Sequence, residues 1–224
     1  MRGVFVTGTD TGVGKTVLAA AIAAGLAARG ERVAAFKPVL TGLDEPPDDW
    51  PRDHELLARV ASAGQSPGDV APLRFGPPVS PHHAAELAGT TIEPHELVAA
   101  ARRAAAEADV LVCEGVGGLM VPLTPGYLVR DLAVDLHLPL VIAARPGLGT
   151  INHSRLTLEA ARAAGLEPRA VVLTPWPEEP SRMEESNRAT IAALGDVEVA
   201  TLPPTAPDRL AAAAEGLPLQ DWLG

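Results

Sequence analysis

The stretch TGTDTGVGKT, from Thr7 to Thr16, decides the fold of this chain. It follows a short apolar run, Val4–Val6, and it precedes an alanine-rich run from Val17 to Ala28. A glycine loop between a strand and a helix is the usual setting of a phosphate-binding loop, because curled backbone N–H groups and the positive end of the helix face one anion. Thr9 occupies the place of the usual first glycine, so we predict a variant of this loop.

Two side chains of this stretch indicate its chemistry. Lys15 can reach the β- and γ-phosphates of a nucleotide, and the Thr16 hydroxyl can ligate Mg²⁺. A tight turn between strand and helix would explain the glycines, but it would not explain Lys15 followed by Thr16. The sequence therefore predicts a nucleotide-phosphate site.

Composition limits the other functions that the chain could have. With 224 residues, 47% of them hydrophobic, we expect a single domain over residues 1–224 with a sizeable core. The net charge of −10 and the absence of a Lys/Arg cluster predict no nucleic-acid binding. No apolar run has the length of a membrane span, and no signal peptide is expected. A single cysteine, Cys113, is typical of a reducing cytoplasm, and we interpret it as a core residue.

Strand and helix patterns alternate along the chain. Strands are expected at Val4–Val6, Arg32–Phe36, Asp109–Cys113, Met120–Leu123, Leu140–Ala144, Ala170–Leu173 and Val197–Ala200. Helices are expected at Lys15–Arg29, Asp53–Ala63, His82–Ala88, Pro94–Ala108, Val129–Leu136, Asn152–Ala164, Arg182–Leu194 and Asp208–Ala214, with a loop over Gln65–Val79. This alternation predicts an α/β fold of three layers, with a mostly parallel sheet covered by helices on both faces.

Polar side chains follow three of the expected strands or loops, at the edge of the sheet where ligands bind. Lys37 leaves the second strand, with Thr41 four residues later, and beside a phosphate loop we favour a ligand for it over a merely exposed ammonium group. Glu114 ends the third strand, where a carboxylate commonly serves Mg²⁺. Asp53 is either a second metal carboxylate or the cap of a helix. Thr16, Asp53 and Glu114 would suit Mg²⁺.

Together these segments resemble the dethiobiotin synthetase family of biotin biosynthesis, within the P-loop NTPase superfamily. The matching segments are Thr7–Thr16, Phe36–Val39 with Thr41-Gly42, Ser80–His82, Glu114–Gly118, Asp131, and Leu148–His153 followed by Leu156-Thr157. The resemblance implies a cyclo-ligase that converts 7,8-diaminopelargonic acid, CO₂ and ATP to dethiobiotin, ADP and phosphate. It implies that one amine captures CO₂ as a carbamate, which attacks the γ-phosphate, and that the second amine closes the ring as phosphate leaves.

The same resemblance implies roles for individual residues. Lys37 would steady the carbamate, with Lys15 and Thr11 as further catalytic residues, and Thr16, Asp53 and Glu114 would hold Mg²⁺. The implied substrate contacts are Lys37, Thr41, Gly118, Gly149 and Asn152. The implied nucleotide contacts are Gly12, Val13, Gly14, Lys15, Thr16, Val17, Asp53, Glu114, Gly115, Val116, Gly117, Thr174, Pro175, Pro203 and Pro204. In the family the turn that contains Gly149 and Asn152 belongs to the neighbouring subunit, so a homodimer is implied.

Two positions leave alternatives open. Asp53 follows a loop of variable length, so Asp48 or Asp49 could be the metal ligand instead. Thr174-Pro175 stands where family members often carry Asn-Asp, and Pro203-Pro204 replaces a Pro-Trp pair. An amide side chain that reads a purine is therefore not available there, and we hypothesise a weak or altered nucleotide preference.

Two other classes of protein share such a loop. A switch ATPase of the partition or septum-site type usually carries an early lysine in the loop and often a basic or amphipathic tail. This chain has no such lysine, and its last sixteen residues carry Arg209 against Asp208, Glu215 and Asp221. An amide-forming synthetase of cobalamin-type metabolism would require a glutaminase partner. The sequence favours the biotin enzyme.

Overall fold

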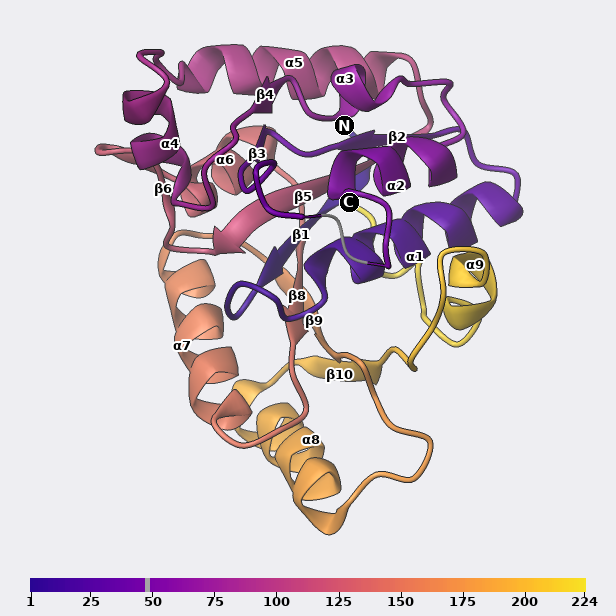
Figure 1. The fold of residues 1–224 in the computed structure, drawn as a ribbon. Coiled ribbons are helices and arrows are strands. Elements are labelled where there is room, and N and C mark those ends of the chain that lie inside the picture. Colours follow the sequence, from indigo (N-terminus) through magenta and orange to yellow (C-terminus); the bar gives the residue numbers. More distant parts are fainter. Residues whose placement is uncertain (47–48) are drawn as a thin grey trace.

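The computed structural model describes residues 1–46 and 49–224, and its centre is a six-stranded sheet with the order β10-β9-β8-β1-β5-β2 (Figure 1). All neighbouring strands in this sheet pair in parallel. The strands are β1 (Gly3–Gly8), β2 (Val33–Phe36), β5 (Val110–Gly118), β8 (Leu140–Ala144), β9 (Pro168–Leu173) and β10 (Glu198–Thr201). The predicted parallel sheet is thus confirmed.

Helices cover both faces of this sheet, because successive strand residues point to opposite sides. In β1, Val4 and Val6 belong to one core cluster, and Phe5 belongs to the other. The Val4 face is covered by α1 (Lys15–Ala28), α2 (Asp53–Val60), α3 (Pro67–Val70) and α9 (Leu210–Ala213). The Phe5 face is covered by α4 (Pro81–Leu87), α5 (Pro94–Ala106), α6 (Val129–Leu136), α7 (Thr150–Ala163) and α8 (Arg182–Gly195). The predicted three-layer α/β/α fold is confirmed.

Several element boundaries differ from those expected. The predicted loop over Gln65–Val79 contains α3 and β4 (Leu73–Arg74), which pairs with β3 (Val39–Leu40). The strand expected at Met120–Leu123 is β6 (Pro122–Thr124), and it forms a hairpin with β7 (Tyr127–Leu128). Strand β5 continues past Cys113 to Gly118, because Gly118 pairs with Gly8 beyond a register shift. The pairings of β3 with β4 and of Gly118 with Gly8 depend on partners far away in the sequence.

An N-cap and a helix start also differ, and both concern the site. Helix α2 has extended Arg52 at its N-cap and Asp53 as its first helical residue, so the prediction that Asp53 caps this helix was wrong. The Asp53 carboxylate contacts Lys37 instead. Helix α7 begins at Thr150, two residues before the expected Asn152, because Gly149 at its N-cap adopts a left-handed φ of 88°.

The C-terminal segment completes the core around α1, whose residues are buried on most sides. A Cβ placed on Gly25 would lie 2.9 Å from Ala214 Cβ and 2.9 Å from Leu219 Cδ1, so only glycine permits this close approach. Trp222 is 1% exposed, and its indole Nε1 donates a hydrogen bond to Glu198 Oε2 at 3.2 Å. In the part of the chain that the structure describes, no helix has both the length and the apolar character to cross a bilayer.

Because Trp222 fills the core from the last turn of the chain, Trp222→Ala should lower the free energy of unfolding by about 3–5 kcal/mol. Leu194→Ala is the matched control, since Leu194 is 59% exposed, and it should change this free energy by no more than about 0.5 kcal/mol. Urea unfolding of both variants measures the difference. Equal midpoints for Trp222→Ala and the wild type would show that the tail is not part of the cooperative core.

Candidate functional site

The loop between β1 and α1 is curled by two glycines. Gly12 and Gly14 have φ values of 70° and 87°, in the left-handed region that a residue without Cβ occupies at little cost. Gly14 is the N-cap of α1, which begins at Lys15. A Cβ on Gly14 would lie 2.9 Å from Thr174 Cγ2, so the end of β9 packs directly against the loop. The loop therefore presents the start of α1 to a cavity above the sheet.

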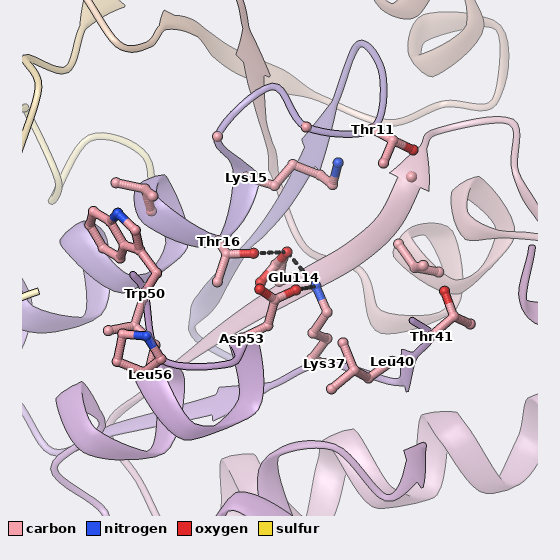
Figure 2. Close-up of a pocket in the computed structure, with 16 residues that line it drawn as sticks. Thr11, Lys15, Thr16, Lys37, Leu40, Thr41, Trp50, Asp53, Leu56 and Glu114 are labelled. Carbon is pink, nitrogen blue, oxygen red and sulfur yellow. Dashed lines mark hydrogen bonds and ion pairs between the residues drawn. The ribbon is translucent and has the colours of Figure 1, made fainter. Parts of the chain in front are cut away.

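Four side chains meet beside this loop, from four segments of the chain: Thr16 from α1, Lys37 from just after β2, Asp53 from α2 and Glu114 from β5 (Figure 2). Lys37 Nζ lies 2.5 Å from Glu114 Oε1 and 2.8 Å from Asp53 Oδ2. The Thr16 hydroxyl donates to the same Glu114 oxygen at 2.9 Å. Glu114 is 0% exposed and Lys37 is 3% exposed, so this ion pair is removed from solvent. The predicted convergence of these side chains is confirmed, but Glu114 lies within β5 and not at its carboxyl end, because β5 continues to Gly118.

The charges of this group depend on one another. Burial opposes the charge of Lys37, but Glu114 and Asp53 outweigh burial and raise the pKa of Lys37. Burial raises the pKa of the Glu114 carboxyl, and Lys37 opposes this rise. Burial also acts to raise the pKa of Asp53, but Lys37 outweighs it, so the pKa of Asp53 is lowered. The Lys37 ammonium group thus compensates the negative charge of the Glu114 and Asp53 carboxylates inside the protein.

The second cation of the site is Lys15, which is 7% exposed. Its Nζ donates to the Asp10 carbonyl oxygen at 2.8 Å, across the loop. Burial lowers the pKa of Lys15, and Glu114 opposes this shift. Lys15 and Lys37 are the only two lysines in the sequence, and both line the same cavity.

The cavity has a volume of about 380 Å³. It is lined by Thr11, Gly12, Gly14, Lys15, Thr16, Val17, Lys37, Leu40, Thr41, Trp50, Pro51, Asp53, Leu56, Glu114, Val116 and Gly117. A second cavity of about 350 Å³ adjoins it, since both include Thr11, Thr41, Val116 and Gly117. The remaining lining of the second cavity is mainly apolar, with Pro78, Val79, Pro81 and Val121 beside the polar Glu45 and Ser80. The charged cavity beside the glycine loop thus opens into a second, mainly apolar cavity.

Some predicted site residues lie away from the described lining of this cavity. Val13 and Gly115 are buried in the core, and Gly118 lies beside the loop at Gly8. Gly149 and Asn152 line a separate depression at the start of α7. Thr174 and Pro175 follow β9, Pro203 and Pro204 follow β10, and the four are not among the described residues that line the cavity.

Sequence reasoning missed four apolar lining residues: Leu40, Trp50, Pro51 and Leu56. A signal for Trp50 was present, since aromatic residues make up only 3% of the chain and this one stands three residues before Asp53. No comparable signal marks Leu40 or Leu56, which resemble ordinary core residues.

The residues present suit a small, hard cation. Glu114 Oε2 is buried and has no hydrogen-bond partner in the described structure, so one carboxylate oxygen is available beside Asp53 and Thr16. Among residues 1–46 and 49–224 no three His, Cys, Asp or Glu side chains gather as a metal site. Two carboxylates and a hydroxyl are what Mg²⁺ accepts, because it retains several waters. Asp49 does not belong to the described lining of the cavity, and Asp48 lies outside the described residues.

The fold and the loop define a P-loop nucleotide-binding protein, and a family model described as an AAA domain matches residues 2–208. The ATP-dependent dethiobiotin synthetase BioD of Bacillus subtilis (strain 168) is 36% identical over 204 residues, 91% of this chain and 87% of that protein. The synthetase of the same name from Anaeromyxobacter dehalogenans (strain 2CP-1) is 41% identical over 208 residues, 93% and 92% of the two chains. That of Mycobacterium avium (strain 104) is 40% identical over 100% of this chain and 98% of its own. The chain belongs to the dethiobiotin synthetase family.

Lys37→Met should leave Glu114 buried without its cation, and the expected loss in the free energy of unfolding is about 3–5 kcal/mol. The double variant Lys37→Met/Glu114→Gln should recover most of that loss, because a neutral amide replaces the uncompensated charge. Urea unfolding at neutral pH measures both variants against the wild type. A single variant as stable as the wild type would show that the pair does not compensate buried charge.

Proposed function

We propose that this protein closes the ureido ring of dethiobiotin from 7,8-diaminopelargonic acid and CO₂, with ATP cleaved to ADP and phosphate. The observation that carries the proposal is the group of Lys37, Lys15 and Thr16 beside a curled glycine loop, in a charged cavity that opens into an apolar one. Membership in the dethiobiotin synthetase family supports it. Residues 1–224 would act as one functional domain in biotin biosynthesis.

The charged cavity suits the triphosphate of ATP. Backbone N–H groups from Gly12 to Val17 and the Lys15 ammonium group would hold the phosphates, as in other glycine loops. Thr16, Asp53 and Glu114 would hold Mg²⁺, which when bound neutralises charge on the phosphate oxygens. Thr174, Pro175, Pro203 and Pro204 remain the predicted surroundings of the base, and Thr174 packs against the loop at Gly14.

The position of Lys37 suits a role where the carbamate and the γ-phosphate would react. Its ammonium group lies between the loop and Thr41, where it can hold the oxygens of a carbamate against the γ-phosphate. Thr11 and Thr41 line both cavities, so their hydroxyl groups can orient the two amines at the boundary. The adjoining cavity suits the methylene chain of the substrate, because Pro78, Val79 and Val121 supply most of its apolar lining, whereas Glu45 and Ser80 are its additional polar residues.

We also propose a homodimer in the cytoplasm. Leu148 and Leu156 are 87% and 58% exposed, and they flank the depression that contains Gly149 and Asn152. Exposed leucines around such a depression are typical of a subunit contact. In that arrangement Gly149 and Asn152 would serve the substrate of the neighbouring subunit. The single buried Cys113 is compatible with a reducing compartment.

The direct test is phosphate release with ATP, bicarbonate and 7,8-diaminopelargonic acid, with each component omitted in turn. Release should require all three, and dethiobiotin should accumulate in equal amount. Lys37→Ala should lower turnover about 10²- to 10⁴-fold, because a cation that stabilises transition-state charge is lost. Phosphate release without the diamine at the full rate would instead indicate a simple ATPase.

Glu114→Gln should raise the MgCl₂ concentration that gives half-maximal turnover by about 10- to 100-fold, since an amide is a poorer ligand for Mg²⁺. Glu178→Gln is the matched control, because Glu178 is an exposed residue in the loop after β9, and its titration should match the wild type. A Glu114→Gln titration that coincides with the control would remove Glu114 from the metal site.

A further inference from the structure

The two ends of the charged cavity differ in chemistry. Figure 2 shows Lys37 and Glu114 in the middle, with Thr11 and Thr41 on one side and Trp50 and Leu56 on the other. The Thr11 end continues into the second cavity. The Trp50 end is bounded by the side chains of Val17, Trp50, Pro51 and Leu56, and among these side chains only the indole N–H can donate to a phosphate.

A bound triphosphate must lie in this cavity with a defined direction. Its γ-phosphate has to meet the carbamate, and the amines arrive at the Thr11 end because the apolar cavity opens there. The α-phosphate then points toward Thr16 and Val17, and the rest of the nucleotide leaves the cavity at the opposite end. That end is the one bounded by Trp50 and Leu56.

An apolar and aromatic surface suits a nucleoside better than a phosphate. Aromatic side chains stack on bases of any sequence, because every base has a π-face. We infer that the Trp50 indole packs against the nucleoside of bound ATP and is a binding residue of this subsite. The inference rests on the proposed function, because the direction of the triphosphate follows from where its γ-phosphate would meet the carbamate.

Trp50 and the residues that follow it make several contacts with the rest of the chain. Trp50 packs against the core cluster that includes Leu56 and Leu57. The Arg52 guanidinium donates to the Glu45 carbonyl oxygen at 3.0 Å, and Asp53 pairs with Lys37 at 2.8 Å. Because Trp50 and Asp53 share this segment, the indole is positioned before the nucleotide arrives, which reduces the entropy lost on binding.

Intrinsic fluorescence tests the inference, because the chain has only three tryptophans and their surroundings differ. Trp222 is 1% exposed in the core, and Trp176 lies after β9 with the Arg188 guanidinium 5.9 Å from its ring. ATP should change the emission of the wild type and of Trp176→Phe, but it should leave Trp50→Phe nearly unchanged. Tripolyphosphate, which has the phosphates without a nucleoside, should have a much smaller effect on the wild type than ATP has.

Binding constants give the second measurement. Trp50→Ala should weaken ATP binding by about 5- to 150-fold, the range expected for loss of one stacked base, and leave tripolyphosphate binding within about twofold. Trp50→Phe should keep most of the ATP affinity, since it keeps an aromatic face. Tripolyphosphate binding also shows that each variant is folded around the loop.

Each other result overturns the inference in a distinct way. Unchanged ATP affinity in Trp50→Ala, with an altered response only in Trp176→Phe, would place the nucleoside wholly at the ends of β9 and β10. Equal weakening of ATP and tripolyphosphate would mean that Trp50 acts through Asp53 and not on the nucleoside. If the wild type bound neither compound, the proposed function itself would fail, whereas binding of both without a Trp50 effect would overturn this inference alone.

Discussion

The buried ion pair between Lys37 and Glu114 is the interaction on which the rest of the site depends. Each group alone would be costly in the interior, and their 2.5 Å contact is what allows a lysine just after β2 and a glutamate within β5 to be buried side by side. Asp53 and Thr16 add their contacts to the same two groups, from the starts of α2 and α1. One pair thus connects two strands and two helices above the sheet.

The parallel sheet is what makes this pair possible. Strands β2 and β5 run in the same direction in register, with Phe36 opposite Cys113, so Lys37, which follows β2, lies beside Glu114, which is still paired with β1 inside β5. The glycine loop follows β1, the other neighbour of β5. Cations, carboxylates and backbone N–H groups therefore gather there.

The cavity is charged at its centre and apolar towards both ends. Its charged centre suits phosphates and a cation, whereas the apolar surfaces beyond Thr11 on one side and at Trp50 on the other suit a methylene chain and a nucleoside. Burial strengthens the electrostatic contacts in the centre, because water competes less there. Such a division lets two substrates with charged reacting ends meet while their neutral parts point away from each other.

By itself the sequence determined the features that depend on neighbours along the chain. The curled loop, the start of α1 at Lys15 and the apolar strands follow from local spacing and propensity, and the convergence of Lys37 with Glu114 follows once those strands are parallel. Tertiary structure alone decided which role Asp53 takes, that β5 extends to Gly118, and that Leu40, Trp50, Pro51 and Leu56 line the cavity. It also decided that Gly149 and Asn152 lie in a separate depression. The physical reason is that a cavity is bounded by residues brought together from distant segments, and an apolar side chain carries no local mark that separates a cavity lining from a filled core.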